Sequence, residues 1–298
     1  MSKRKVHQFH DKSQKSLFSH PTMVKDLLKG FVDEKFVNDI DYGQVEKVNV
    51  SYVSKQYQAT ESDLLLKLNI KGRETYLYLL IELQSTVDKF IVLRALSYML
   101  SFYGDLLKQK KGKIDKFPPV FPIVLYTGTD TYTAPTHIED LIDHWEITDY
   151  IPKFKCYKIA VNEGKEKQDE LISTDNVAAA FFKLISAKTT KELFEAIEYL
   201  CKIVKSPELE KEILNFIKHL MIRMNINIDD FPFEEGGLEM LETLVSKIKE
   251  EGYEEGKEEG IQEGVANVAR NAYKEGQSIE LISKITGLPI EKLKQILN

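Results

Sequence analysis

Two neighbouring runs of alternating apolar residues constrain the fold of this chain most. They cover Ser62–Ile70 and Thr75–Gln84, and the turn signal Lys-Gly-Arg-Glu separates them. Apolar residues at every second position are typical of β-strands, and a short connection that contains glycine joins two such strands into a hairpin. The sequence therefore predicts a buried antiparallel hairpin.

The alternation also predicts two chemically different faces. A turn centred on Gly72 and Arg73 pairs residues whose numbers sum to 145, so Asp63 is expected directly opposite Glu82. One face is then wholly aliphatic, with Leu64, Leu66, Leu68, Ile70, Leu77, Leu79, Ile81 and Leu83. The other face carries Asp63, Leu65, Lys67, Asn69, Tyr76, Tyr78, Leu80, Glu82 and Gln84.

Two opposed carboxylates need a positive partner. Directly paired side chains have Cβ atoms about 4.5–5.5 Å apart, and like charges at that separation repel each other. A hard divalent cation such as Mg²⁺, Mn²⁺ or Ca²⁺ prefers oxygen ligands, and two carboxylates plus a backbone carbonyl suffice if waters complete the shell. Such an ion activates water and stabilises charge on a phosphoryl oxygen. The alternative is that Asp63 and Glu82 are strand-end residues that face solvent.

The remaining periodicity predicts a mixed sheet flanked by helices. The order is helix, three strands, helix and strand, which indicates an α/β fold. The expected helices cover residues 13–32, broken at Pro21, residues 88–110, and residues 175–224 with breaks near Lys188 and at Ser206–Pro207. The other expected strands cover residues 45–53, 118–128 and 155–161.

The charge distribution predicts a separate tail. The net charge is −6, and residues 234–298 hold 14 acids against 8 Lys and Arg, so residues 1–233 are neutral. We therefore expect a body of residues 1–234 and an acidic helical tail of residues 235–298. Gly252, Gly256, Gly260 and Gly264 recur every four residues, which favours either close packing of helices in a homo-oligomer or disorder. Residues 276–297 resemble a small helix-turn-helix around Thr-Gly-Leu-Pro.

Composition narrows the class of protein. Cys156 and Cys201 lack metal-ligand spacing and are far apart, so we expect neither a disulfide framework nor a zinc site, and a reducing, cytoplasmic setting. The basic N-terminal segment is followed by no apolar stretch, and no run approaches the length of a membrane span. We therefore expect no membrane partner.

Several phrases in order resemble one family. "HDKSQKSLFSHP", "SDLL", "YLYLLIELQS", "LRALSYMLSFY" and "PPVFPIVLYTG" are similar to the recombination-promoting nucleases, also labelled YhgA-like transposases. That family belongs to the PD-(D/E)XK nuclease superfamily. The resemblance implies a restriction-endonuclease-like fold and Mg²⁺-dependent hydrolysis of DNA.

The resemblance also implies roles for individual residues. Asp63 and Glu82 would be catalytic and hold the metal together with the backbone carbonyl of Leu83. Gln84 stands where the superfamily has lysine; it could orient water or phosphate but carries no charge. Asp11, with Asp26 as a second candidate, could supply a further acid, although a helix cap or a solvated face explains either residue as well.

Four residues are candidates for contact with DNA. Arg94 and Tyr98 lie one helical turn apart and resemble the helix pattern of the family, although they could be a surface pair. Lys110 and Lys111 belong to the basic segment Lys108–Lys116, which could bind phosphates or be a solvated surface. The sequence thus predicts a DNA endonuclease, and the alternative is an inactive DNA-binding or assembly protein with the same fold.

Overall fold

The computed structural model describes residues 14–48, 63–82, 87–143, 146–224, 226, 246, 264–273, 275 and 277–297. The chain divides into two compact units, Met1–Leu238 and Glu239–Asn298. The boundary between these units falls outside the described residues, so the predicted division after residue 234 stays a prediction.

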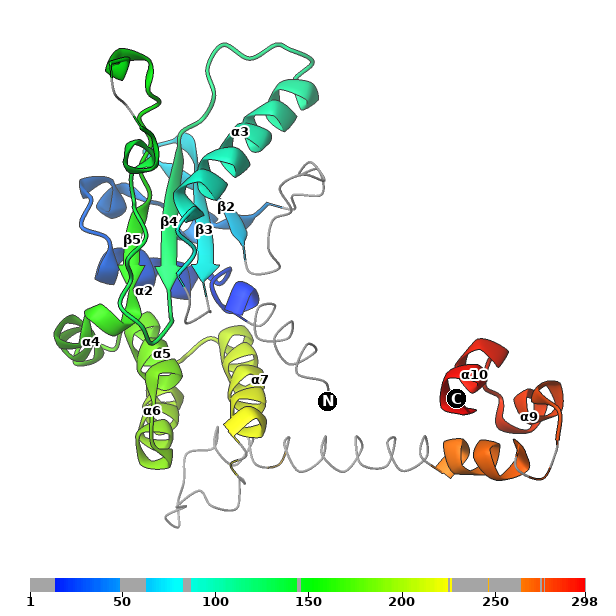
Figure 1. Ribbon diagram of the computed structural model, residues 1–298. Helices are drawn as coiled ribbons and strands as arrows, with labels where there is room; N and C mark the ends of the chain where they lie inside the picture. The colour runs from blue at the N-terminus through cyan, green and yellow to red at the C-terminus, as the bar shows by residue number, and fades with distance from the viewer. Residues whose placement is uncertain are drawn as a thin grey trace. The chain divides into compact units, whose positions relative to one another are not determined.

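A five-stranded mixed sheet forms the centre of the first unit (Figure 1). Its strands, in spatial order, are β1 (Glu46–Lys47), β2 (Leu64–Ile70), β3 (Arg73–Glu82), β4 (Val120–Tyr126) and β5 (Tyr157–Ala160). The pairs β1–β2 and β2–β3 are antiparallel, whereas β3–β4 and β4–β5 are parallel. The predicted mixed α/β fold is confirmed. Of the first strand expected over residues 45–53, only residues 45–48 are described, and they include the short β1.

The predicted hairpin is confirmed, but the predicted register was wrong. Paired residues sum to 143, as in Leu64 opposite Leu79, because the turn is centred on Lys71 and Gly72. Both residues have positive φ, 51° and 79°, as a two-residue type I′ turn requires. The Asn69 side chain accepts a hydrogen bond from the Gly72 N–H over 2.8 Å and fixes this turn. The pairing shifts by two residues, so the two faces keep the predicted composition.

One face of the sheet packs against α3 (Ile91–Gln109), which crosses it in Figure 1. Leu65, Tyr78, Leu80, Val124 and Tyr126 from the strands form one buried cluster with residues of α3. The members from α3 are Ile91, Val92, Ala95, Tyr98 and Phe102. The face that carries Asp63 is thus the face that α3 covers.

Residues that precede the sheet in the sequence cover its opposite face. Phe36, in the 3-10 helix η1 (Lys35–Asp39), packs edge-on against Phe121 of β4, with ring centroids 4.9 Å apart. Tyr157 of β5 donates a hydrogen bond to the carbonyl of Phe31, the last residue of α2 (Pro21–Phe31), and accepts one from the Asp33 N–H. These contacts fix the C-terminal end of α2 beside the sheet.

A helical layer completes the first unit. Its helices are α4 (Lys165–Ile172), α5 (Val177–Ser186), α6 (Thr190–Ile203) and α7 (Pro207–Met224). Phe181 of α5 packs against Phe18 and against Phe216 of α7, with ring centroids 5.9 and 4.9 Å apart. The breaks predicted near Lys188 and at Ser206–Pro207 are confirmed, whereas α4 was not predicted. Short 3-10 turns link the elements: η2 (Tyr42–Gln44), η3 (Ile138–Leu141), η4 (Thr148–Tyr150) and η5 (Val161–Glu163).

The second unit has short helices over residues 264–273, α9 (Ile279–Thr286) and α10 (Ile290–Leu297). Ala269, Ile282 and Leu293, one from each helix, form its buried core. Gly287 ends α9 in the left-handed conformation, with φ of 70°, and lies within the predicted Thr-Gly-Leu-Pro turn. Across the described residues of both units, no helix combines the length and the apolar character that a membrane span needs.

Candidate active site

Asp63 lies immediately before β2 and is almost completely buried, with 3% of the residue exposed. Continuing the observed register by one pair places it opposite Leu80 on the face that α3 covers. The Tyr78 hydroxyl donates a hydrogen bond to Asp63 Oδ2 over 3.0 Å. A buried carboxylate is costly without such a donor, so Tyr78 stabilises Asp63 in this position.

Tyr78 is itself held by Tyr98 of α3. The two rings are stacked with centroids 4.0 Å apart and planes 3° from parallel. Burial, and then the negative charge of Asp63, raise the pKa of Tyr78 well above its ordinary value of 10. The Tyr78 hydroxyl therefore keeps its proton, and remains a hydrogen-bond donor, at neutral pH.

Arg94 brings positive charge to the same carboxylate. Its Nη2 lies 4.0 Å from Asp63 Oδ1, and its Nη1 lies 3.2 Å from Asp88 Oδ2. Asp88 also accepts a hydrogen bond from the Phe90 N–H, at the start of α3. The first turn of α3 is thereby fixed beside Asp63, with a guanidinium group between two acids.

Glu82 is the last residue of β3, and its backbone pairs with Tyr126 of β4. Strand alternation gives Glu82 the same face as Tyr78 and Leu80. The expected direct pairing with Asp63 was wrong because of the register, and Glu82 is instead the diagonal neighbour of Asp63. Diagonal neighbours in an antiparallel pair are about 7–8 Å apart, a span that two carboxylate side chains and one bridging cation can fill.

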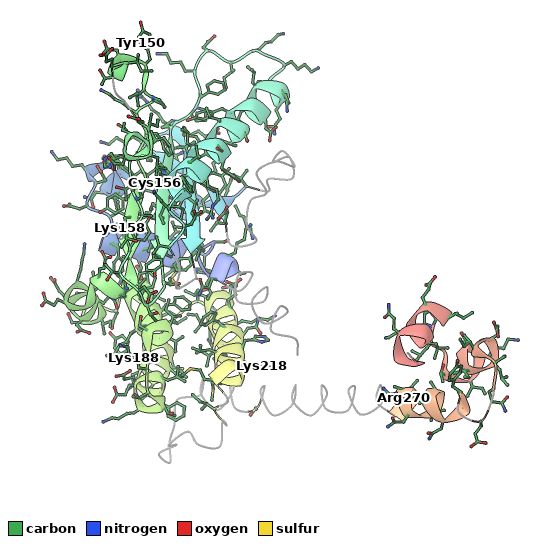
Figure 2. All side chains as sticks on the ribbon, in the orientation of Figure 1. Tyr150, Cys156, Lys158, Lys188, Lys218 and Arg270 are labelled. Atoms are coloured by element: carbon green, nitrogen blue, oxygen red, sulfur yellow. The ribbon has the colours of Figure 1, made fainter. Side chains whose placement is uncertain are left out.

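Aromatic residues support the sheet next to Glu82. Tyr126 is fully buried and packs edge-on against Tyr132, with ring centroids 5.4 Å apart. Lys158 of β5, labelled in Figure 2, places its Nζ 5.5 Å from the centre of the Tyr132 ring and 2.6 Å from Glu163 Oε2. The Tyr132 N–H donates to the other carboxylate oxygen of Glu163. These contacts order the segment that follows β4.

Three predicted site residues, Asp11, Leu83 and Gln84, lie outside the described residues, as does the side chain of Glu82. Asp26, the second candidate for an additional acid, has a structural role. Its carboxylate accepts a hydrogen bond from the Val177 N–H over 2.8 Å and so caps the start of α5. Burial raises the pKa of Asp26, and the Val177 hydrogen bond opposes that effect.

The predicted DNA contacts fall into two groups. Arg94 borders Asp63, whereas Tyr98 is only 5% exposed and its ring supports Tyr78. Lys110 and Lys111 are exposed just beyond the C-terminal end of α3. They lie about 24 Å from Arg94 at the rise of an α-helix, so one ligand would have to be extended to touch both ends. Contact of these four residues with DNA stays a prediction.

The oxygen donors fit a hard divalent cation. No group of three or more His, Cys, Asp or Glu with metal-binding geometry occurs among the residues that the structure describes. The candidate ligand set from the sequence has two carboxylates, Asp63 and Glu82, plus the Leu83 carbonyl, and extends beyond those residues. Such an oxygen-only set suits Mg²⁺ rather than zinc.

Sequence reasoning missed Tyr78 and Asp88 as parts of this site. Tyr78 shares a strand face with Glu82 at even spacing, which could have indicated that its hydroxyl approaches Asp63. Asp88 accepts the N–H of the residue two positions further on, Phe90, as aspartates do in an Asx turn. Both residues connect α3 to the acid that the sequence did single out.

Comparison with known proteins gives a consistent set of matches. Residues 8–253 match the family model described as "Putative transposase, YhgA-like". Recombination-promoting nuclease RpnD of Escherichia coli O157:H7 is 24% identical over 120 residues, which are 40% of this chain and 45% of RpnD. The matched part thus spans less than half the length of that relative.

Two further relatives come from Escherichia coli strain K12. Recombination-promoting nuclease RpnC is 23% identical over 299 residues, which cover 97% of each chain. The nuclease-like protein YjiP, whose name describes it as inactive, is 24% identical over 92 residues, which are 31% of this chain and 89% of YjiP. No solved structure matches the chain.

Proposed function

Because the chain belongs to the YhgA-like transposase family, whose matched relatives include proteins named recombination-promoting nucleases, we propose that it is a metal-dependent DNA endonuclease. The observation that carries the proposal is the buried Asp63, which Tyr78 and Arg94 position on the same sheet face as Glu82. Burial of a carboxylate is costly, so a buried acid that is held by a tyrosine hydroxyl and a guanidinium group is a candidate for a functional role.

Asp63, Glu82 and the Leu83 carbonyl would hold the ion, with Mg²⁺ as the first choice and Mn²⁺ or Ca²⁺ as substitutes. When bound, the ion would supply an activated water and stabilise negative charge on the attacked phosphate. The task of this chain's own residues is to hold the two carboxylates at a fixed separation. Tyr78 does so for Asp63, and the pairing of Glu82 with Tyr126 fixes the backbone from which the second acid projects.

The sheet supports a restriction-endonuclease-like arrangement. An antiparallel hairpin that continues into parallel strands, with α3 between β3 and β4, is the order that the family resemblance implies. Gln84 would orient the attacking water or the phosphate through its amide. Arg94 is a basic group beside Asp63, with Nη2 4.0 Å from Oδ1, and is placed to meet a phosphate that approaches the site.

The substrate would be DNA, and the biological role would be promotion of recombination or action on mobile DNA, as the names of the relatives suggest. The alternative, an inactive DNA-binding or assembly protein, gains support from Gln84 and from the name of the relative YjiP. The dedicated partners of Asp63 favour the active enzyme. Self-association through the tail and a cytoplasmic location stay predictions.

Incubation of the purified protein with supercoiled plasmid, with Mg²⁺ or with EDTA, tests the proposal. We expect nicked and linear DNA with Mg²⁺ and intact plasmid with EDTA. Cleavage that persists in EDTA would contradict metal dependence. Intact plasmid with Mg²⁺, Mn²⁺ and Ca²⁺ alike would contradict the nuclease itself.

A further inference from the structure

Helix α3 is apolar on both of its sides. It has 19 residues, of which three carry a charge: Arg94, Asp105 and Lys108. Its inner side belongs to the buried cluster on the sheet. A helix that is apolar all round is normally covered all round, because each uncovered apolar side chain forfeits hydrophobic stabilisation. On its outer side, Leu93, Leu100 and Leu107 stay exposed among the residues that the structure describes.

The outer side carries a regular stripe, which we name the α3 stripe: Leu93, Ser97, Leu100, Gly104 and Leu107. Its three leucines are 43%, 58% and 42% exposed and recur every seven residues, the spacing of a coiled-coil seam. The Ser97 hydroxyl donates a hydrogen bond to the Leu93 carbonyl over 2.9 Å, so this donor is satisfied within the helix. The stripe therefore alternates large apolar and small residues.

No contact within the described part of the chain explains why residue 104 is a glycine. A Cβ added there would meet no atom within 4 Å, so nothing nearby requires a glycine. Glycine inside a helix nevertheless costs about 1 kcal/mol relative to alanine. A second helix that approaches closely at this point would explain the missing side chain, because a glycine lets the two backbones come together.

The stripe is self-complementary about Leu100. Read in the reverse direction, Leu107, Gly104, Leu100, Ser97 and Leu93 again alternate large and small side chains at similar intervals. An antiparallel copy thus places leucines beside leucines and small residues beside small residues, as an isologous two-fold interface requires. We infer that the α3 stripe pairs with the α3 stripe of a second copy of this chain, antiparallel, about a two-fold axis next to Leu100.

Charge favours the antiparallel direction. In that arrangement Arg94 of each copy lies level with Asp105 of the other, but Arg94 is already paired with Asp88 and Asp105 with Lys108. The main effect of charge is therefore repulsion in the parallel alternative. A parallel pair would bring together the basic ends of the two helices, which carry Lys108 in the last turn and Lys110 and Lys111 just beyond it, and these would repel each other. The antiparallel pair keeps them at opposite ends of helices that are each about 28 Å long.

The apolar surface extends past the ends of α3. Phe90, just before the helix, and Phe117, which stacks on Tyr103 with ring centroids 4.6 Å apart, are also exposed. Stable dimers bury about 800 Å² per partner, more than one short helix supplies, so these flanking rings would enlarge the interface. The inference requires neither nuclease activity nor the acidic tail.

Light scattering after size-exclusion chromatography gives the first test. The full chain is expected at twice its mass of 34.4 kDa. Leu100→Glu should weaken the dimer about tenfold or more, because a carboxylate would lose its water in the interface. Ile147→Glu, at a 63% exposed position outside α3, is the matched control and should leave the mass unchanged. A monomeric wild type, or an unchanged dimer in Leu100→Glu, would overturn the inference.

Cysteine cross-linking tests the axis and excludes dimers formed only through the tail. Under copper-phenanthroline and oxygen, Leu100→Cys should form a disulfide between two chains. Leu93→Cys should form a disulfide between chains only when it is mixed with Leu107→Cys, because the antiparallel pair places these two positions side by side. Native Cys156, labelled in Figure 2, and Cys201 are buried, and burial raises the pKa of each thiol to about 12, so they should contribute little background. Lack of the Leu100→Cys cross-link in a folded dimer would overturn the proposed axis.

Discussion

The Tyr78 hydroxyl lies 3.0 Å from Asp63 Oδ2, and the Tyr78 ring stacks on Tyr98. One tyrosine thereby connects the acid before β2, strand β3 and helix α3. The geometry gives Tyr78 the role of a positioning residue: it touches Asp63 rather than a substrate. This role can be separated experimentally from the packing of the ring.

Tyr78→Phe should destabilise the protein by about 1–3 kcal/mol, because a buried carboxylate oxygen loses its donor. The same variant should weaken metal binding and lower the single-turnover cleavage rate. Tyr98→Phe is the matched control, since it keeps the ring stack. Urea unfolding and metal titration, run on both variants, provide the comparison. Equal unfolding free energies and equal metal affinities in the two variants would argue against a positioning role for the Tyr78 hydroxyl.

Gln84 allows a test of charge at the end of β3. If the strand geometry continued beyond Glu82, the Cα of Gln84 would lie about 7 Å further along on the same face. A residue that acts on the transition state changes the rate more than the binding of substrate. We therefore expect Gln84→Ala to lower kcat more than DNA affinity, and Gln84→Lys to retain or raise cleavage. Single-turnover rates at saturating DNA measure this, and equal rates for wild type and Gln84→Ala would remove Gln84 from the mechanism.

The Lys71–Gly72 turn makes a prediction about stability. Gly72→Ala should cost about 1–2 kcal/mol, because its φ of 79° is left-handed. Lys71→Asn should be neutral or stabilising, since Asn-Gly is the preferred type I′ pair. The ion pair of Lys71 with Asp39 that this variant loses is exposed and contributes little. Urea unfolding of both variants tests the turn conformation. An unchanged free energy of unfolding in Gly72→Ala would contradict the left-handed conformation of residue 72.

Alternation of residues was enough to predict the composition of both hairpin faces, because that pattern is local to each strand. The exact pairing was not predictable in the same way. A turn at Lys71–Gly72 and one at Gly72–Arg73 give identical faces, and only the Asn69 contact and the two positive φ angles distinguish them. The roles of Tyr78 and Arg94 likewise depend on how α3 crosses the sheet, which is a long-range contact that periodicity does not encode.

His20 makes stability depend on pH. Its Nδ1 accepts the Thr22 N–H at the start of α2, and its Nε2 lies 3.1 Å from Ser206 Oγ near the start of α7. Burial lowers its pKa below 6.5, although Glu212 and Glu208 oppose this. The unfolded chain therefore binds the proton more readily, so stability is fully present above about pH 6.5 and is lost as the pH falls through the folded pKa.

His20→Asn keeps a side chain that can cap α2 but removes the titrating group. The loss of unfolding free energy between about pH 8 and about pH 5.5 should be smaller in this variant than in wild type. Urea unfolding at both pH values supplies the comparison. If the pH dependence is the same in both proteins, His20 is not its source.

The central claim is that the buried carboxylate of Asp63 holds the metal of a DNA endonuclease. Asp63→Asn keeps the shape of the side chain and a hydrogen-bond acceptor for Tyr78, but removes the charge that a divalent cation needs. The most direct measurement is single-turnover plasmid cleavage in Mg²⁺ by wild type and Asp63→Asn, with circular dichroism to verify the fold. We predict Mg²⁺-dependent cleavage by wild type and none by the folded variant. Cleavage by folded Asp63→Asn at the wild-type rate would contradict the claim.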